Sequence, residues 1–266
     1  MIDFWGGIEV ALRITFLGAL FCLLAAVASA QTNSTPAGVR GIGVQSDDAR
    51  TIVDRMLRAQ KDNKAHVRAF TVKRGYHLYD KQRQEKAQVV ANITVLPPDG
   101  KEFQVESSSG GMGEKVLREI LNKETESPRD AQRKDLSPEN YDFQLLGQGM
   151  LDGRRCYLLG LNPKREDKDL LRGKIWVDAE SYNIRRLEGS PVKNPSWWIH
   201  DIQILMSFAD VDGMWLRTFT HAVANVRFKG KYIMESRDLE YNFTQETASR
   251  HHRRSPGILA GSAINP

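Results

Sequence analysis

The side chains with catalytic potential are few, and they form no recognised pattern. His200, Asp201 and His221 fall in two neighbouring predicted strands. Adjacent residues of a strand point to opposite faces, so we expect that His200 and Asp201 do not converge. The sequence contains no G-x-S-x-G, H-E-x-x-H, P-loop or C-x-x-C motif. We therefore expect no catalytic residues, no bound metal and no cofactor, and a secreted hydrolase is only a distant alternative.

The two cysteines offer little chemistry either. Cys22 lies in an apolar N-terminal segment, and Cys156 lies in a strand pattern. If the N-terminal segment is removed, one cysteine remains and no intramolecular disulfide can form. The simplest interpretation of Cys156 is a small buried hydrophobe, with a reactive thiol as the alternative.

Binding of an apolar ligand is the chemistry that the residue pattern favours. Each methylene of an acyl chain that leaves water for a dry cavity gains about 0.8 kcal/mol. The alternation of apolar residues along several predicted strands places large side chains on one face. The candidate lipid-contact residues are Trp176, Trp198, Ile202, Ile204, Met206, Phe208, Trp215 and Phe219. The alternative is that these side chains only pack against helices, or that Trp197 and Trp198 rest at a membrane interface.

The N-terminal segment has the features of a signal peptide. Arg13 precedes an apolar run over residues 14–27, and a small-residue cleavage motif ends at Ala30. We predict a signal peptide over residues 1–30, cleavage after Ala30 and export to the periplasm, with Val10 as an alternative start. The apolar run is short for a membrane-spanning helix, which needs about 20 residues, so an uncleaved anchor is the weaker alternative.

The rest of the chain is expected to form one domain. Residues 31–46 are rich in Gly, Ser and Thr and predict a flexible leader, and residues 244–266 predict a disordered tail. The domain between them spans residues 47–243 and contains no linker long enough to divide it.

Two short helices are predicted from apolar stripes at helical spacing. The first begins near Ser46, and the second covers residues 113–123 after a Gly-Gly pair. The residues expected to contact the sheet are Ile52, Val53, Met56 and Leu57 in the first helix, and Val116, Leu117, Ile120 and Leu121 in the second.

Strands account for most of the remaining domain. Residues 65–108 predict three strands, and residues 153–243 predict an antiparallel meander in which turn residues such as Asp212-Gly213 follow long period-two segments. A sheet with one apolar face must cover that face. The predicted fold class is α+β, mostly β: a strongly curved antiparallel sheet, or half-open β-barrel, with the two helices over its concave face.

The charge balance is slightly basic, with a formal net charge of +5. In an exported protein this suits an anionic membrane surface or an acidic envelope partner, although a solvated surface is the simpler interpretation. Nucleic acid is not an expected partner, because export separates the protein from it and no recognition motif is present.

Several motifs of the meander resemble the bacterial outer-membrane lipoprotein-sorting proteins of the LolA/LolB-like type. They lie in GRRCYLLGLNPK, GKIWVDAESYNIRRLEG and FADVDGMW. The matching residues are Gly153, Cys156, Tyr157, Pro163, Lys164, Trp176, Val177, Asp178, Tyr182, Arg186, Glu188, Val211, Asp212, Gly213 and Trp215. The resemblance implies a half-open barrel with an apolar cavity that shields the acyl chains of a lipid or lipoprotein during transport.

Two functions from different classes remain. The first is a periplasmic lipid- or lipoprotein-binding carrier of the lipoprotein-sorting type, a chaperone for acyl chains between membranes. The second is an envelope sensor or interaction domain of the same fold that transports no lipid and whose cavity is filled by its own side chains.

Overall fold

A computed structural model describes residues 46–98, 100–125, 134–195 and 197–243. The predicted signal peptide, its cleavage site after Ala30, nearly all of the predicted leader and the predicted tail lie outside the described residues. The elements are α1 (Ser46–His66), β1 (Phe70–Asp80), β2 (Glu85–Leu96), β3 (Gly100–Ser108), α2 (Gly111–Thr125), β4 (Tyr141–Leu151), β5 (Arg154–Pro163), β6 (Leu171–Asp178), β7 (Ile184–Pro191), β8 (Ile199–Val211), β9 (Met214–Val226) and β10 (Gly230–Phe243).

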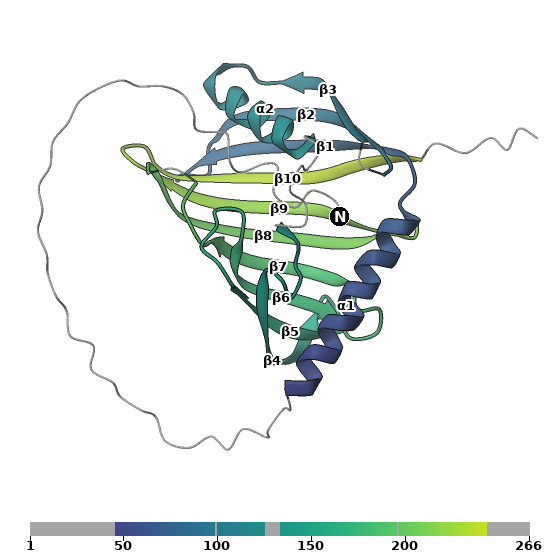
Figure 1. The fold of residues 1–266 in the computed structure, drawn as a ribbon. Coiled ribbons are helices and arrows are strands. Elements are labelled where there is room, and N and C mark those ends of the chain that lie inside the picture. The colour runs from purple at the N-terminus through teal and green to yellow at the C-terminus, as the bar shows by residue number, and fades with distance from the viewer. Residues whose placement is uncertain (1–45, 99, 126–133, 196, 244–266) are drawn as a thin grey trace, which may run out of the picture.

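The strands form one 10-stranded antiparallel sheet in the order β3-β2-β1-β10-β9-β8-β7-β6-β5-β4. Sequence neighbours pair as hairpins, except that α2 separates β3 from β4 and β1 pairs with β10. The sheet is curved but not closed, and β3 and β4 are its edges (Figure 1). The predicted half-open architecture is therefore confirmed.

Turn chemistry sets the hairpins of the meander. Asp212 and Gly213 both have positive φ, 54° and 79°, as a two-residue turn that follows the twist of the strands requires. Between β6 and β7 the Asp178 carboxylate accepts hydrogen bonds from the amides of Glu180 and Ser181, both at 3.0 Å. Local sequence therefore fixes where these strands reverse.

The two helices lie on the same face of the sheet but cover different parts of it (Figure 1). α1 packs on β4 and β9, and α2 packs on β1, β2 and β3. In the part of the chain that the structure describes, no helix is long and apolar enough to cross a membrane. The predicted helices and their cover of the concave face are present, and each helix buries its own half of the sheet.

Candidate functional site on the concave face

The half of the concave face under α1 is an apolar cluster. Ile52, Val53 and Met56 of α1 are buried in it, and Leu57 is partly buried against it. The predicted contact stripe of the first helix therefore faces the sheet. Its strand partners include Leu159, Leu161, Ile175, Leu187, Ile202, Ile204 and Met206.

The half under α2 is a second apolar cluster. Leu117, Ile120 and Leu121 are buried and Val116 is partly buried, as the predicted stripe of the second helix requires. The partners on the sheet are Phe70, Val72, Tyr76, Val89, Ala91 and Ile93, together with Met214 and Leu216 of β9.

Between the two clusters, β9 and β10 carry apolar side chains that stay partly exposed. Tyr232 pairs with Ala224, and Met234 pairs with Ala222, which in turn pairs with the buried Ile204 of β8. These four side chains are half-buried, as is Trp198, which directly precedes β8. We call this set the central strip: Trp198, Ala222, Ala224, Tyr232 and Met234. The strip combines two small side chains, Ala222 and Ala224, with three large ones.

Five of the predicted lipid-contact residues come together here. Ile202, Ile204 and Met206 are buried in the α1 cluster, and Trp198 and Phe208 pack against it. They are cross-strand or same-face neighbours of the central strip, which places the predicted apolar face of this strand toward the helices.

The other three predicted lipid-contact residues lie outside these two clusters of the described residues. The Trp215 indole N–H donates to the Ile184 carbonyl at 2.6 Å. The Phe219 ring lies 4.6 Å from the Arg237 guanidinium, and the Trp176 ring lies against Gly149. Each of these aromatic rings already has a protein partner.

A buried ionic network, which the sequence did not reveal, lies beside α2. Arg74 of β1 binds both Glu124 at the end of α2 and Asp238 of β10, and Arg217 of β9 also binds Glu124. The Tyr76 hydroxyl donates to Glu124 at 2.8 Å. The only sequence signal is that Arg74 interrupts the apolar alternation of β1.

Electrostatics hold this network in its ionised form. Burial opposes ionisation of Glu124, but the guanidinium groups of Arg217 and Arg74 outweigh it and lower its pKa to about 2. The same carboxylates raise the pKa of Arg74 against the effect of its burial. The network therefore joins α2 to β1, β9 and β10 by charge as well as by apolar contact.

One prediction about catalytic side chains was wrong. His200 and Asp201 do converge, with the His200 Nδ1 atom 2.7 Å from a carboxylate oxygen of Asp201. Asp201 has a φ of 54° and sits in an irregularity of the β8–β9 pairing, so the simple alternation of faces fails there. The pair is exposed, and Asn225 also donates to Asp201.

Other chemistry is sparse in the described residues. They contain no group of three or more His, Cys, Asp and Glu side chains that could hold a metal ion. Cys156 is buried as predicted, and burial raises the pKa of its thiol, which disfavours the reactive thiolate.

A polar groove of about 580 Å³ lies on the face of β1 and β2 opposite α2. Its side chains alternate along β1 and β2 with residues buried under the helix. They include Lys73, Asn92 and Glu106, which interact with one another. Such a lining does not suit an acyl chain, so this groove is not the candidate site.

No family model and no curated protein sequence matches the chain. Similar solved structures include a domain from Vibrio parahaemolyticus described provisionally as an outer membrane lipoprotein-sorting protein (12% identity, TM-score 0.42, covering 74% of this chain and 95% of that one). A LolA superfamily protein from Nitrosomonas europaea shares 10% identity with a TM-score of 0.40, over 74% and 93% of the two chains. A DUF1329 family protein from Desulfovibrio piger shares 13% identity with a TM-score of 0.40, over 74% and 94%.

Proposed function

We propose that the chain is an exported, periplasmic protein that shields acyl chains of a lipid or lipoprotein on the central strip between α1 and α2. One observation carries the proposal. Each half of the concave face holds a buried apolar cluster, yet the strip between the clusters keeps Ala222, Ala224 and Met234 half-exposed. An apolar ligand gains the most binding free energy where the protein leaves apolar surface exposed to solvent.

The geometry suits a linear apolar ligand. Cross-strand pairs Tyr232–Ala224 and Met234–Ala222 lie in a row along β9 and β10, with Ile204 beside them. Each methylene of a chain laid along this row would contribute about 0.8 kcal/mol, without any polar contact. In this proposal the ligand lies over the small Ala222 and Ala224, with the larger Tyr232, Met234 and Trp198 beside it.

Filling the row is the direct test of the proposal. Ala222→Trp would place a large side chain where the acyl chain lies, so we expect it to weaken binding of a fluorescent fatty acid about tenfold, a loss of about 1.4 kcal/mol. Native mass spectrometry of protein purified from the periplasm would show whether phospholipid or acylated peptide co-purifies, and the variant should carry less of it.

Gln203→Trp is the matched control, because Gln203 is exposed and lies between Ile202 and Ile204, which face the core. It should bind fatty acid as the unaltered protein does. Equal binding by Ala222→Trp and the unaltered protein would refute the proposed site. Absence of lipid together with recovery of a tight protein partner would favour an envelope interaction domain instead.

A further inference from the structure

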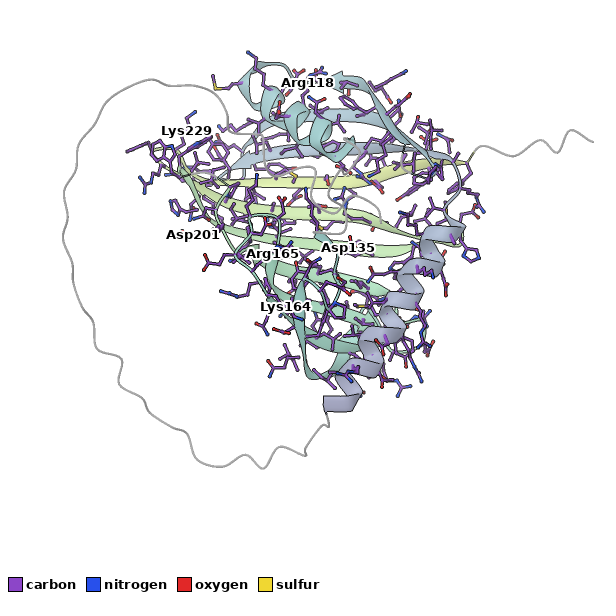
Figure 2. All side chains as sticks on the ribbon, in the orientation of Figure 1. Arg118, Asp135, Lys164, Arg165, Asp201 and Lys229 are labelled. Atoms are coloured by element: carbon purple, nitrogen blue, oxygen red, sulfur yellow. The ribbon has the colours of Figure 1, made fainter. Side chains whose placement is uncertain are left out.

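One end of the sheet gathers aromatic and basic side chains from three loops. The loops are the β1–β2 turn (81–84), the connection into β8 (192–195 and 197–198) and the β9–β10 turn (227–229). Backbone contacts hold them together: the Arg227 amide donates to the Trp198 carbonyl at 2.9 Å, and Asp80 pairs with Tyr232 where β1 ends and β10 begins. Figure 2 shows Lys229 at this end, beyond the strands.

Two aromatic side chains project from these loops into solvent. Phe228 is 98% exposed and Trp197 is 72% exposed, the two largest values among the exposed large hydrophobic residues of the described chain. Phe228 also has a φ of 64°, a conformation that favours Gly or Asn over a bulky residue. The turn therefore carries a large apolar side chain where neither packing nor backbone preference calls for one.

Basic residues are neighbours of both aromatic residues, and Arg227 and Lys229 flank Phe228 in the sequence. The Arg227 guanidinium lies 5.4 Å from the centre of the Trp197 ring, and Lys81 contacts the Gly230 position. Among the described residues, Lys81, Lys229 and Lys231 make no ion pair, while Arg83 pairs with Glu235 at 3.1 Å. We call Lys81, Trp197, Arg227, Phe228, Lys229 and Lys231 the aromatic–basic tip.

We propose that the aromatic–basic tip docks the protein on an anionic lipid bilayer. Cationic side chains are attracted to the anionic headgroups, and Trp prefers the interface between headgroups and hydrocarbon. Phe228 at the apex would enter the acyl boundary, with the Lys and Arg side chains remaining at the phosphates. This surface adjoins the central strip at Trp198 but shares no residue with it, and the docking proposal does not depend on the acyl-binding proposal. An acidic protein would satisfy the charges but gives no role to an apolar apex.

Vesicle sedimentation of the full chain tests the proposal. Vesicles of phosphatidylethanolamine and phosphatidylglycerol should bind the protein, vesicles of phosphatidylcholine alone should bind it weakly, and added salt should weaken the binding. Trp197→Ser with Phe228→Asn, and separately Lys229→Glu with Lys231→Glu, should each reduce vesicle binding about tenfold. Phe228→Asn suits the positive φ, so the aromatic variant should unfold no earlier than the unaltered protein.

Two control variants match these changes elsewhere on the surface. Met150→Ser removes a side chain that is 62% exposed on the edge strand β4, and Arg58→Glu with Lys61→Glu reverses two exposed charges on α1. Both should sediment with vesicles as the unaltered protein does. Fatty acid binding without vesicles should be unchanged in the tip variants, which separates this proposal from the acyl-binding one. Vesicle binding that survives the aromatic variant, or that falls equally in the controls, would overturn it.

Discussion

Arg74 shows how a single polar residue can organise an otherwise apolar face. Its guanidinium reaches carboxylates of α2 and β10, and Tyr76 and Arg217 complete the network around Glu124. A buried charge is tolerated only when its partners are present, so removal of one partner is more damaging than the net contribution of the pair. Glu124 is the member shared by both arginines.

Glu124→Gln is therefore expected to destabilise the protein by on the order of 3 kcal/mol at neutral pH. The pKa of Glu124 lies near 2, below its ordinary value of 4.5. Its ionisation therefore contributes stability that is fully present above pH 4.5 and is lost as the pH falls through about 2. Urea unfolding from pH 7 down to pH 2 should show the variant and the unaltered protein converging. A difference that does not change with pH, or a similar effect of Glu119→Gln on the same helix, would contradict this explanation.

At the scale of the element, the two helices are attached differently. α2 joins apolar contacts to the ionic network, whereas in the C-terminal part of α1 the Asn63 side chain binds the backbone of β9. The Asn63 amide oxygen accepts from the Trp215 amide at 2.7 Å, and its amide group donates to the Trp215 carbonyl at 2.9 Å. One side chain thus satisfies both backbone groups of a strand residue.

Asn63→Ala should destabilise the protein by about 2 kcal/mol, because both backbone groups of Trp215 lose their partner. Asn63→Asp keeps an acceptor for the Trp215 amide but cannot donate to the Trp215 carbonyl. Its stability should therefore lie between those of the alanine variant and the unaltered protein. Hydrogen exchange should be faster at the Trp215 amide in the alanine variant than in the aspartate variant. Equal exchange in all three proteins would show that Asn63 does not hold α1 in place.

At the scale of the whole molecule, the sheet is joined at β10. This strand pairs with β1 on one side and β9 on the other, and it connects the three strands under α2 to the six strands β4–β9. The edge strand β3, in contrast, pairs only with β2. Loss of one backbone amide should therefore destabilise the protein more in β10 than in β3.

Proline at Ser236 should be far more damaging than proline at Gln104. Ser236 lies between Tyr76 and Thr220, so its amide faces a paired strand whichever way it points. Gln104 has a neighbour on one side only. We expect a loss of roughly 3 kcal/mol or more for Ser236→Pro and a smaller loss for Gln104→Pro, measured by thermal unfolding. Similar losses of stability in the two variants would argue against the conclusion that β10 joins the two parts of the sheet.

Much of the fold could be predicted because local rules determine it. Turn residues such as Asp212-Gly213 locate the hairpins, and the stripes of both helices identify the sides that are buried. Pairing between β1 and β10 has no local signal, and neither does the distribution of the helices over two halves of the sheet. The prediction that His200 and Asp201 point to opposite faces failed, because a bulge at Asp201 changes the direction of its side chain.

The candidate site could be predicted only in part. The apolar row of β8 is visible in the sequence because its period of two is regular, and Trp198 and Phe208 follow from it. The alternation that assigns Trp215 and Phe219 is less regular, because Arg217 and His221 share their predicted face, and the positions of both residues and of Trp176 depend on neighbouring strands. Ala222 and Ala224 are part of the site because their side chains are small. The sequence alone does not identify them, because their neighbours are known only from the register of β8, β9 and β10.

The position of β10 has a consequence for biosynthesis. The last strand of the domain to leave the ribosome is the one that unites its two parts, so the native sheet cannot be completed while residue 243 is still unmade. Until then β1–β3 and β4–β9 are two separate sets of strands, and the edges of β1 and β9 that pair with β10 have no partner. The order of the strands therefore delays completion of the sheet until its last strand has been synthesised.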